Sequence, residues 1–397
     1  MFRKKSNKLF LRSFLAFSNV GRGLLTSFFG LLLNYILIHF NSKEVLNSYV
    51  YFISIFGLFF NFSNWGGKFF NTKEISKSPQ MSKRLISNLI SSKVILLFIA
   101  CFVVVFIPIQ LELKFLLVAL LFLKSLVPIF DSLILLRKKS QTVFACEILL
   151  SAGFLFLVFD NSNKLGSVTF LVCFIGFELV KFLYYLILFW DEISFSFSAK
   201  EAYKILKKSF SFFCVSLAGF IASKSDLYII GILINKEVMS HYFIISSLSS
   251  ICMVVYATLI NTFETSIFRF NHKVFQKLET FLKSFGLVFS LLSAIGFYIV
   301  ANLFYTIPID YKFTILFFAN IFLFTLLNFE MYRFTKLEKQ NIVLLFLIIS
   351  GIINCVFSFL FIKQLLLFGA FLANTLGVLI NYLLMRFYIF KKTTYEI

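Results

Sequence analysis

Charged residues are scarce in this chain of 397 residues: they make up 14% of it, whereas hydrophobic residues make up 60%. A water-soluble domain usually carries about a quarter charged residues, so this chain lacks the polar atoms needed to cover a soluble surface. Acidic residues are especially few, with 18 Asp and Glu against 38 Lys and Arg. The composition predicts an all-α polytopic protein whose main partner is the lipid bilayer.

Cysteine and histidine are also few, and their spacing does not suit a metal site or a disulfide framework. The six cysteines lie inside apolar stretches and form no CxxC pair, which is typical of buried free thiols. The three histidines are scattered near the ends of these stretches, so no zinc site is expected. The basic residues occur in short clusters between apolar stretches rather than on a soluble basic patch, so nucleic acid is not an expected partner. We expect no metal and no cofactor.

Twelve apolar stretches are long enough to cross a bilayer, which takes roughly 20 residues per helix. The connections between them are short. The three longest are 63–86, 191–208 and 263–281, and all three are basic. The predicted spans are 14–39, 45–62, 87–109, 114–136, 142–159, 166–190, 209–234, 241–262, 282–306, 312–332, 341–362 and 366–390.

The basic residues alternate between the two sides of these spans. One side holds 27 of the 38 Lys and Arg residues, and each of the six loops on the other side holds a single lysine. Because the basic side of a membrane protein faces the cytoplasm, both termini are expected there. A missed helix would break the alternation, so about twelve transmembrane helices are predicted. The single lysines of the outward loops are Lys43, Lys114, Lys164, Lys236, Lys312 and Lys363.

A short repeat relates the two halves of the chain. Residues 43–49 and 236–242 share Lys, Glu, Val and Tyr at four of seven positions, and each stretch follows the first helix of a six-helix half. Both halves would begin on the same side, as in transporters built from parallel repeats. We therefore predict two pseudo-symmetric six-helix lobes, residues 1–192 and 193–397, around a central cavity. Duplication without transport is the alternative.

Basic residues inside spanning helices are costly and are functional candidates for that reason. Lys124, Lys181 and Lys224 lie close to the middle of their spans, whereas Lys93 lies a turn or two from an end and can snorkel. Arg22 is a further candidate. The glycines on either side of it would let a partner helix or a ligand approach closely, but a structural cap on a neighbouring carbonyl would equally explain it.

Acidic residues at depth are candidates for ion coupling or charge pairing. Asp131, Glu178 and Asp226 lie well inside their spans. Lys224 and Asp226 are two residues apart and point to nearly opposite sides of a helix, so at least one should meet another helix. Three further acids lie in apolar stretches nearer the cytoplasmic ends: Glu147, Glu264 and Glu330.

Spacing suggests partners for two of these acids. Glu178 and Lys181 are i,i+3 and could neutralise each other. Lys124 and Asp131 are i,i+7 on one face, with Pro128 between them to kink the helix. The basic residues deep in the predicted spans outnumber the acidic ones, so the interior is expected to carry a net positive charge. A positively charged cavity suits an anionic substrate such as a phosphate group.

Four short motifs stand out: Asp226, Gly231, Glu237-Val238 and Tyr242; Trp65-Gly66-Gly67; Pro128 to Asp131; and Gly369-Ala370 with Ala373. These motifs resemble those of the bacterial Wzx-type polysaccharide flippases, within the wider multidrug/oligosaccharidyl-lipid/polysaccharide transporter superfamily. The resemblance covers nearly the whole chain, and its strongest motif is the first, around the exit of the seventh helix. Ser240 and Asn47 depart from the family, which usually has glycine at these positions.

The resemblance implies a non-enzymatic flippase of the bacterial inner membrane. It would move undecaprenyl-pyrophosphate-linked oligosaccharides, the precursors of O-antigen (lipopolysaccharide) or capsule, by alternating access. Polysaccharide polymerase and the chain-length machinery would be its partners. By position, the pyrophosphate or sugar would meet Arg22, Lys124 and Lys224, with Lys181 as a further binding residue. Ion coupling would fall to Asp131, Glu178 or Asp226.

Two other functions remain open. A cation-coupled multidrug antiporter on the same fold would favour a cavity rich in carboxylates and aromatic rings. A polysaccharide polymerase would also be polytopic and basic, but such enzymes normally carry a large extracytoplasmic loop. All the outward loops of this chain are short, which disfavours the polymerase.

Overall fold

The computed structural model describes residues 2–40, 43–67, 70–71, 74–75, 82–162, 164–193, 197–261, 272–336 and 339–395. Every regular element in these ranges is helical, and eleven helices are long and apolar enough to cross a membrane. Four of the 27 basic residues counted on the cytoplasmic side, Lys68, Lys73, Lys77 and Arg269, lie outside the described residues, as does the candidate Glu264. The main helices are α1 (Phe2–His39), α2 (Lys43–Asn64), α4 (Ser82–Val105), α5 (Leu111–Leu136), α6 (Ser140–Asp160), α7 (Ser167–Leu188), α8 (Ala199–Leu233), α9 (Lys236–Asn261), α11 (His272–Ile299), α12 (Tyr311–Lys336) and α13 (Gln340–Tyr395).

The last long helix accounts for the difference between eleven helices and the expected twelve. Asn341–Tyr388 spans 48 residues, about 70 Å as one straight helix, more than twice the thickness of a bilayer core. The backbone leaves helical geometry at Leu366, where φ is 50° and ψ is −125°. Past this break the two arms pack together, because the Phe346 and Tyr388 rings lie 6.2 Å apart. The two predicted spans 341–362 and 366–390 are therefore the two arms of a hairpin.

Two compact units make up the chain, Met1–Leu217 and Ala218–Ile397, here called unit 1 and unit 2. Their boundary falls inside α8, 25 residues beyond the division expected from the sequence. The first half of α8 belongs to unit 1 because it packs there. The Trp65 ring stacks on Phe213 with centroids 3.9 Å apart, and its Nε1 donates to the Leu206 carbonyl at 3.1 Å.

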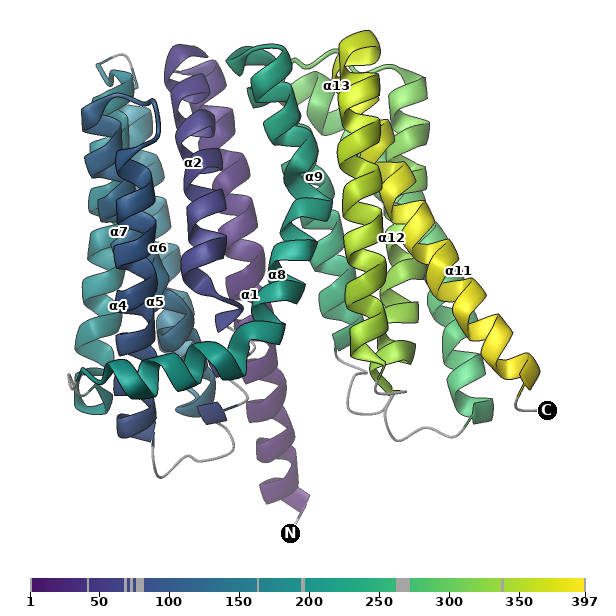
Figure 1. Ribbon diagram of the computed structural model, residues 1–397, viewed down its shortest axis with the longest axis horizontal. Coiled ribbons are helices and arrows are strands. Elements are labelled where there is room, and N and C mark those ends of the chain that lie inside the picture. Colours follow the sequence, from purple (N-terminus) through teal and green to yellow (C-terminus); the bar gives the residue numbers. More distant parts are fainter. Residues whose placement is uncertain are drawn as a thin grey trace. The chain divides into compact units, whose positions relative to one another are not determined.

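The start of α8 corrects the prediction that 191–208 is a connection. The helix begins at Ala199, with the Ser198 hydroxyl accepting a hydrogen bond from the Glu201 N–H. Ala202 and Ser209 face the core of unit 1, whereas the lysines between them are exposed. This part of α8 runs across the direction of α4–α7 (Figure 1). The sequence does not predict this part of α8, because an amphipathic helix that lies across the bundle carries more charge than a membrane-spanning helix.

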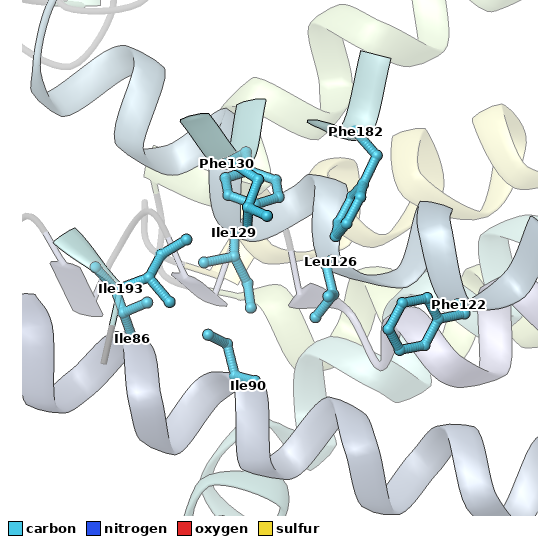
Figure 2. Close-up of a pocket in the computed structure, with 9 residues that line it drawn as sticks. Ile86, Ile90, Phe122, Leu126, Ile129, Phe130, Phe182 and Ile193 are labelled. Carbon is cyan, nitrogen blue, oxygen red and sulfur yellow. The ribbon is translucent and has the colours of Figure 1, made fainter. Parts of the chain in front are cut away.

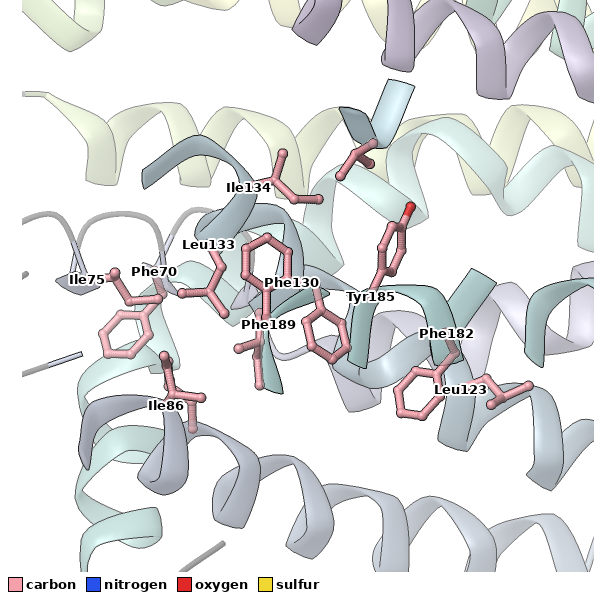
Figure 3. Close-up of a cluster of buried hydrophobic side chains, with 13 residues drawn as sticks. Phe70, Ile75, Ile86, Leu123, Phe130, Leu133, Ile134, Phe182, Tyr185 and Phe189 are labelled. Atoms are coloured by element: carbon pink, nitrogen blue, oxygen red, sulfur yellow. The ribbon is translucent and has the colours of Figure 1, made fainter. Parts of the chain in front are cut away.

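The core of unit 1 joins α4, α5 and α7. Ile86, Phe130, Leu133 and Phe189 are among thirteen buried side chains in one cluster, and Figure 3 shows them packed together between the helices. Tyr185 lies at the edge of this cluster with its hydroxyl pointing away from it. The cluster fixes the relative positions of α5 and α7, which supply most of the charged residues of the site described below.

A buried lysine closes the end of α2. Lys93 was expected to snorkel, but it is only 3% exposed. Its ammonium donates to the Ser63 carbonyl at 3.2 Å and to the Asn64 carbonyl, satisfying two of the carbonyls that a helix end leaves without partners. A Cβ atom at Gly67 would lie 2.7 Å from the Lys93 ammonium nitrogen. The Trp65-Gly66-Gly67 motif therefore has a structural explanation.

Gly66→Ala is expected to destabilise unit 1 by roughly 1–3 kcal/mol. Gly66 has φ +66°, and a Cβ there would lie 2.6 Å from the Phe212 carbonyl carbon, so the turn after α2 would separate from α8. The measurement is the thermal unfolding midpoint in detergent, followed by tryptophan fluorescence. Gly30→Ala is the matched control, because a Cβ at that helical glycine meets nothing within 4 Å. Equal midpoints for both variants would contradict this account of the motif.

Candidate functional site

One cavity in unit 1 is lined by six charged side chains. Its volume is about 370 Å³, and its walls come from α1, α2, α5, α6 and α7. Ionisable groups at this depth are costly unless they are paired, so their pairing shows how the cavity is held together. The charged lining residues are Arg22, Lys124, Asp131, Glu147, Glu178 and Lys181.

Arg22 holds two carboxylates from two different helices. Its Nε and Nη2 donate to the two oxygens of Glu147, both at 3.0 Å, and Nη2 also lies 3.0 Å from Asp131 Oδ1. The Tyr185 hydroxyl donates to the same Glu147 carboxylate. Two parallel N–H···O bonds give the fork geometry that makes arginine selective for carboxylate or phosphate. Arg22 is thus the centre of an interhelical ion cluster rather than a cap on a carbonyl.

Only one of the two glycines beside Arg22 allows a close approach. A Cβ at Gly21 would lie 2.7 Å from the Phe144 ring on α6, whereas a Cβ at Gly23 would meet nothing within 4 Å. Because α1 and α6 pack closely at Gly21, Arg22 can reach Glu147 one turn further along α6. The close approach of a partner helix is confirmed at Gly21, whereas the space beside Gly23 is open.

The second ion pair of the cavity joins α5 to α7. Lys124 Nζ lies 2.6 Å from Glu178 Oε2. The direct partner of Glu178 is therefore Lys124 of the neighbouring helix, whereas the spacing suggested Lys181, three residues along the same helix. Lys181 forms no salt bridge within the described part of the chain. Its ammonium lies 5.4 Å from the centre of the Phe177 ring, in range of a cation–π interaction.

The proline of α5 lies at this ion pair. The helix continues through Pro128, which has no N–H to donate to the carbonyl of Lys124 four residues earlier. Lys124 and Asp131 both line the cavity, as their spacing predicts, but they form ion pairs with residues of two different helices. Asp131 meets Arg22 of α1, and Lys124 meets Glu178 of α7.

The cavity is therefore balanced in charge, with three cations facing three carboxylates. This corrects the expectation of a positive interior for unit 1. The difference is due to Glu147, which the sequence places near a helix end and which the fold turns toward Arg22. Tyr185 was also missed, and its position four residues beyond Lys181 on the same helix face is the signal that could have suggested it.

Lys224 and Asp226 belong to unit 2, and the cavity of unit 1 is lined without them. Asp226 is 1% exposed and accepts hydrogen bonds from the Tyr242 hydroxyl of α9 and from the Leu227 N–H. The prediction that one of the two meets another helix is confirmed for Asp226. Lys224 forms no salt bridge in the described ranges.

The motif around the end of α8 also has a structural basis in unit 2. A Cβ at Gly231 would lie 2.8 Å from Met239 Sδ, so this glycine lets α8 and α9 pack closely. Asn235 caps α9, because its Oδ1 accepts the Val238 N–H at 2.8 Å. Tyr242 completes the contact through Asp226. The motif residues Asp226, Gly231 and Tyr242 therefore hold α8 and α9 together as a helical hairpin.

A second charged cluster of unit 2 lies near the ends of α11, α12 and α13. Arg386 Nη1 lies 3.0 Å from Glu330 Oε1 and 3.6 Å from Glu279 Oε1, and Lys283 pairs with Glu279 at 2.6 Å. Glu330 is buried, and it also lies 3.8 Å from Arg333 Nη1 of its own helix. From the sequence alone, Arg386 is simply one of the 27 basic residues on the cytoplasmic side.

Comparison with known proteins supports the architecture. No protein-family model matches the chain, and no curated protein matches its sequence significantly. Among solved structures, the lipid II flippase MurJ in an inward closed conformation is similar, with a TM-score of 0.72 and 16% identity over 94% of this chain and 87% of that one. An inward-facing MATE-family multidrug resistance transporter of the MOP superfamily has a TM-score of 0.66 and 12% identity, over 95% of this chain and 99% of that one.

A third solved structure extends the similarity to eukaryotic proteins. The MATE transporter AtDTX14 has a TM-score of 0.63 and 12% identity, with 96% of both chains covered. Identity at this level shows the fold alone. The chain is a multi-pass, all-helical membrane protein with the fold shared by MurJ and the MATE transporters.

Proposed function

We propose that the protein flips undecaprenyl-pyrophosphate-linked oligosaccharide units, precursors of O-antigen or capsular polysaccharide, across the bacterial inner membrane. The observation that carries the proposal is the forked Arg22 with Lys124 nearby in one intramembrane cavity. Guanidinium forks bind phosphate in the same geometry as carboxylate. Ionisable residues inside spanning helices are costly and commonly mark substrate pathways where they face a cavity, which is the position of Arg22 and Lys124.

The carboxylates of the cavity act as internal counter-ions in this proposal. Glu147 and Glu178 occupy the positions around Arg22 and Lys124 that phosphate oxygens would take. A diphosphate entering the cavity displaces them, and they return when it leaves. Uptake of a proton or another cation by a displaced carboxylate would compensate its charge, with Asp131, Glu178 and Asp226 as the candidates for coupling.

The charge pattern supports an orientation with both termini in the cytoplasm. The substrate of such a flippase is assembled on the cytoplasmic side and used on the other, so the basic side would receive it. A polysaccharide polymerase and chain-length machinery would act on the product. The protein itself would be a carrier and not an enzyme.

A multidrug antiporter is the second candidate, and one observation favours it. The cavity holds as many carboxylates as cations, and Phe56, Phe60 and Phe182 also line it. Carboxylates beside aromatic faces suit an organic cation. The MATE transporters with this fold are of comparable structural similarity.

Purified protein in proteoliposomes is expected to flip a polyprenyl-diphosphate-linked oligosaccharide. The diphosphate is the group that Arg22 and Lys124 would bind, so a polyprenyl glycoside without it is the matched control and should remain in its leaflet. The measurement is the fraction of labelled glycan accessible to an added glycosidase. Transport of a fluorescent organic cation, with no flipping of the diphosphate lipid, would establish the antiporter instead.

A further inference from the structure

The first half of α8, residues 199–217, is held on unit 1 along its buried side. Ile193, just before the helix, packs on the core of unit 1 and lies beside Ile86 of α4 in an apolar pocket (Figure 2). Further along, the Leu206 carbonyl accepts the hydrogen bond from Trp65, and the Phe213 ring stacks on the ring of Trp65. Because these contacts hold the segment near both of its ends, its opposite side faces away from unit 1.

The exposed side of this segment carries two parallel lines of residues. Lys200 and Lys207 are exposed and seven residues apart, so they lie on one line along the helix. Tyr203 and Phe210 repeat the same spacing, about 60° around the helix from the lysines. They are 67% and 53% exposed. A basic line beside an aromatic line is typical of a helix that lies in the plane of a membrane surface.

The segment lies at the level where spanning helices of unit 1 end. The chain enters it from the end of α7, where Trp190 is 60% exposed, and its middle contacts Trp65 in the turn that follows α2. It runs across the direction of α4–α7 (Figure 1). Tryptophan is enriched where a membrane meets water, so lipid headgroups are the expected neighbours of the exposed side of the helix.

The two lysines of the basic line are available to an anion. Lys204 and Lys208 of the same segment each pair with a carboxylate of unit 1. By contrast, Lys200 and Lys207 form no salt bridge within the ranges that the structure describes. Two turns of helix separate them, about 10 Å, so each can reach the phosphate of a different lipid.

We propose that the first half of α8 docks on the headgroups of anionic phospholipids. Lys200 and Lys207 bind the phosphates, and Tyr203 and Phe210 lie among the ends of the acyl chains nearest the surface. Phosphatidylcholine also carries a phosphate, but its choline group cancels the charge, so phosphatidylglycerol is preferred. The charged cavity is lined without residues of α8, and this site does not depend on what that cavity carries.

The test is photo-crosslinking in nanodiscs that contain equal amounts of phosphatidylglycerol and phosphatidylcholine. p-Benzoylphenylalanine replaces Tyr203, which keeps an aromatic ring in place, and mass spectrometry identifies the captured lipids. Phosphatidylglycerol is expected to be captured roughly fivefold more often, the equivalent of about 1 kcal/mol, which is the contribution of one basic residue near an anionic surface. The same probe at Phe98, exposed on the spanning helix α4, should capture the two lipids equally.

Substitution of the basic line tests which residues choose the lipid. Lys200→Gln with Lys207→Gln should bring the capture ratio at position 203 close to one, because the two free cations are gone. Lys277→Gln with Lys339→Gln is the matched control, since it removes the same charge from unit 2, and it should leave the ratio unchanged. An equal loss from both double variants would overturn the assignment to Lys200 and Lys207.

Two further outcomes would contradict the proposal. Equal capture of the two lipids at position 203, with all lysines in place, would overturn the preference for an anionic headgroup. Lipid captured at Phe98 but not at Tyr203 would overturn the docking itself. All these readouts measure lipid contact, so they stand whether or not the protein flips a diphosphate lipid.

Discussion

Arg22→Ala is expected to abolish transport and to destabilise the protein by roughly 3–5 kcal/mol. Within the described part of the chain, Arg22 is the one residue that forms a salt bridge with both Glu147 and Asp131, so the substitution leaves these two carboxylates of a largely buried cluster without that cation. The measurements are the flipping assay and the thermal unfolding midpoint in detergent.

A compensated variant separates binding from stability. Arg22→Ala combined with Glu147→Gln and Asp131→Asn removes the orphaned charges, so the unfolding midpoint should recover. Transport should not recover, because the fork that receives the phosphate is still missing. Arg22→Lys is the milder comparison, since it keeps the charge but loses the two parallel hydrogen bonds. Full transport by the compensated variant would show that Arg22 has a structural role alone.

Lys124→Ala and Lys224→Ala are both expected to stop transport but to differ in stability. A charge-assisted hydrogen bond to a phosphate contributes roughly 1.5–3 kcal/mol, so losing one costs roughly tenfold to a hundredfold in affinity. Lys124→Ala also orphans Glu178, which lies 2.6 Å away, and should lower the unfolding midpoint. Lys224 has no salt bridge in the described ranges, so its replacement should leave the midpoint unchanged.

The charge swap Lys124→Glu with Glu178→Lys is the control for the first of these variants. It rebuilds the ion pair between α5 and α7 with reversed sign, so it should restore the midpoint. If Lys124 binds phosphate, the swap leaves transport impaired. Transport at the wild-type rate by Lys124→Ala or by Lys224→Ala would remove that residue from the proposed substrate site.

The transmembrane helices were predictable because the bilayer imposes them. Each helix must be long and apolar whatever packs beside it, so the spans, including the hairpin of α13, follow from local composition. The prediction failed for segments whose structure depends on contacts with other helices. The first half of α8 is too charged to be recognised as a span, and its place in unit 1 depends on Trp65 and Phe213.

The charged residues of the site were predictable as individual positions but not as pairs. Arg22, Lys124, Asp131 and Glu178 stand out because their cost in an apolar helix is visible in the sequence. Spacing along one helix suggested that Glu178 would pair with its neighbour on α7. The direct partner comes from α5, because α5 and α7 pack around a common core that places Lys124 Nζ 2.6 Å from Glu178 Oε2.

The sequence by itself determined that this is a multi-pass membrane protein, where its long apolar helices lie, and which buried charges need an explanation. These follow from the energy of placing each residue in hydrocarbon, which is a property of the residue and its immediate neighbours. Only the tertiary structure decided that the charges lining the cavity of unit 1 balance, because Glu147 meets Arg22 across 125 residues of chain. Such a pair depends on how α1 packs against α6 at Gly21, and no local pattern records that contact.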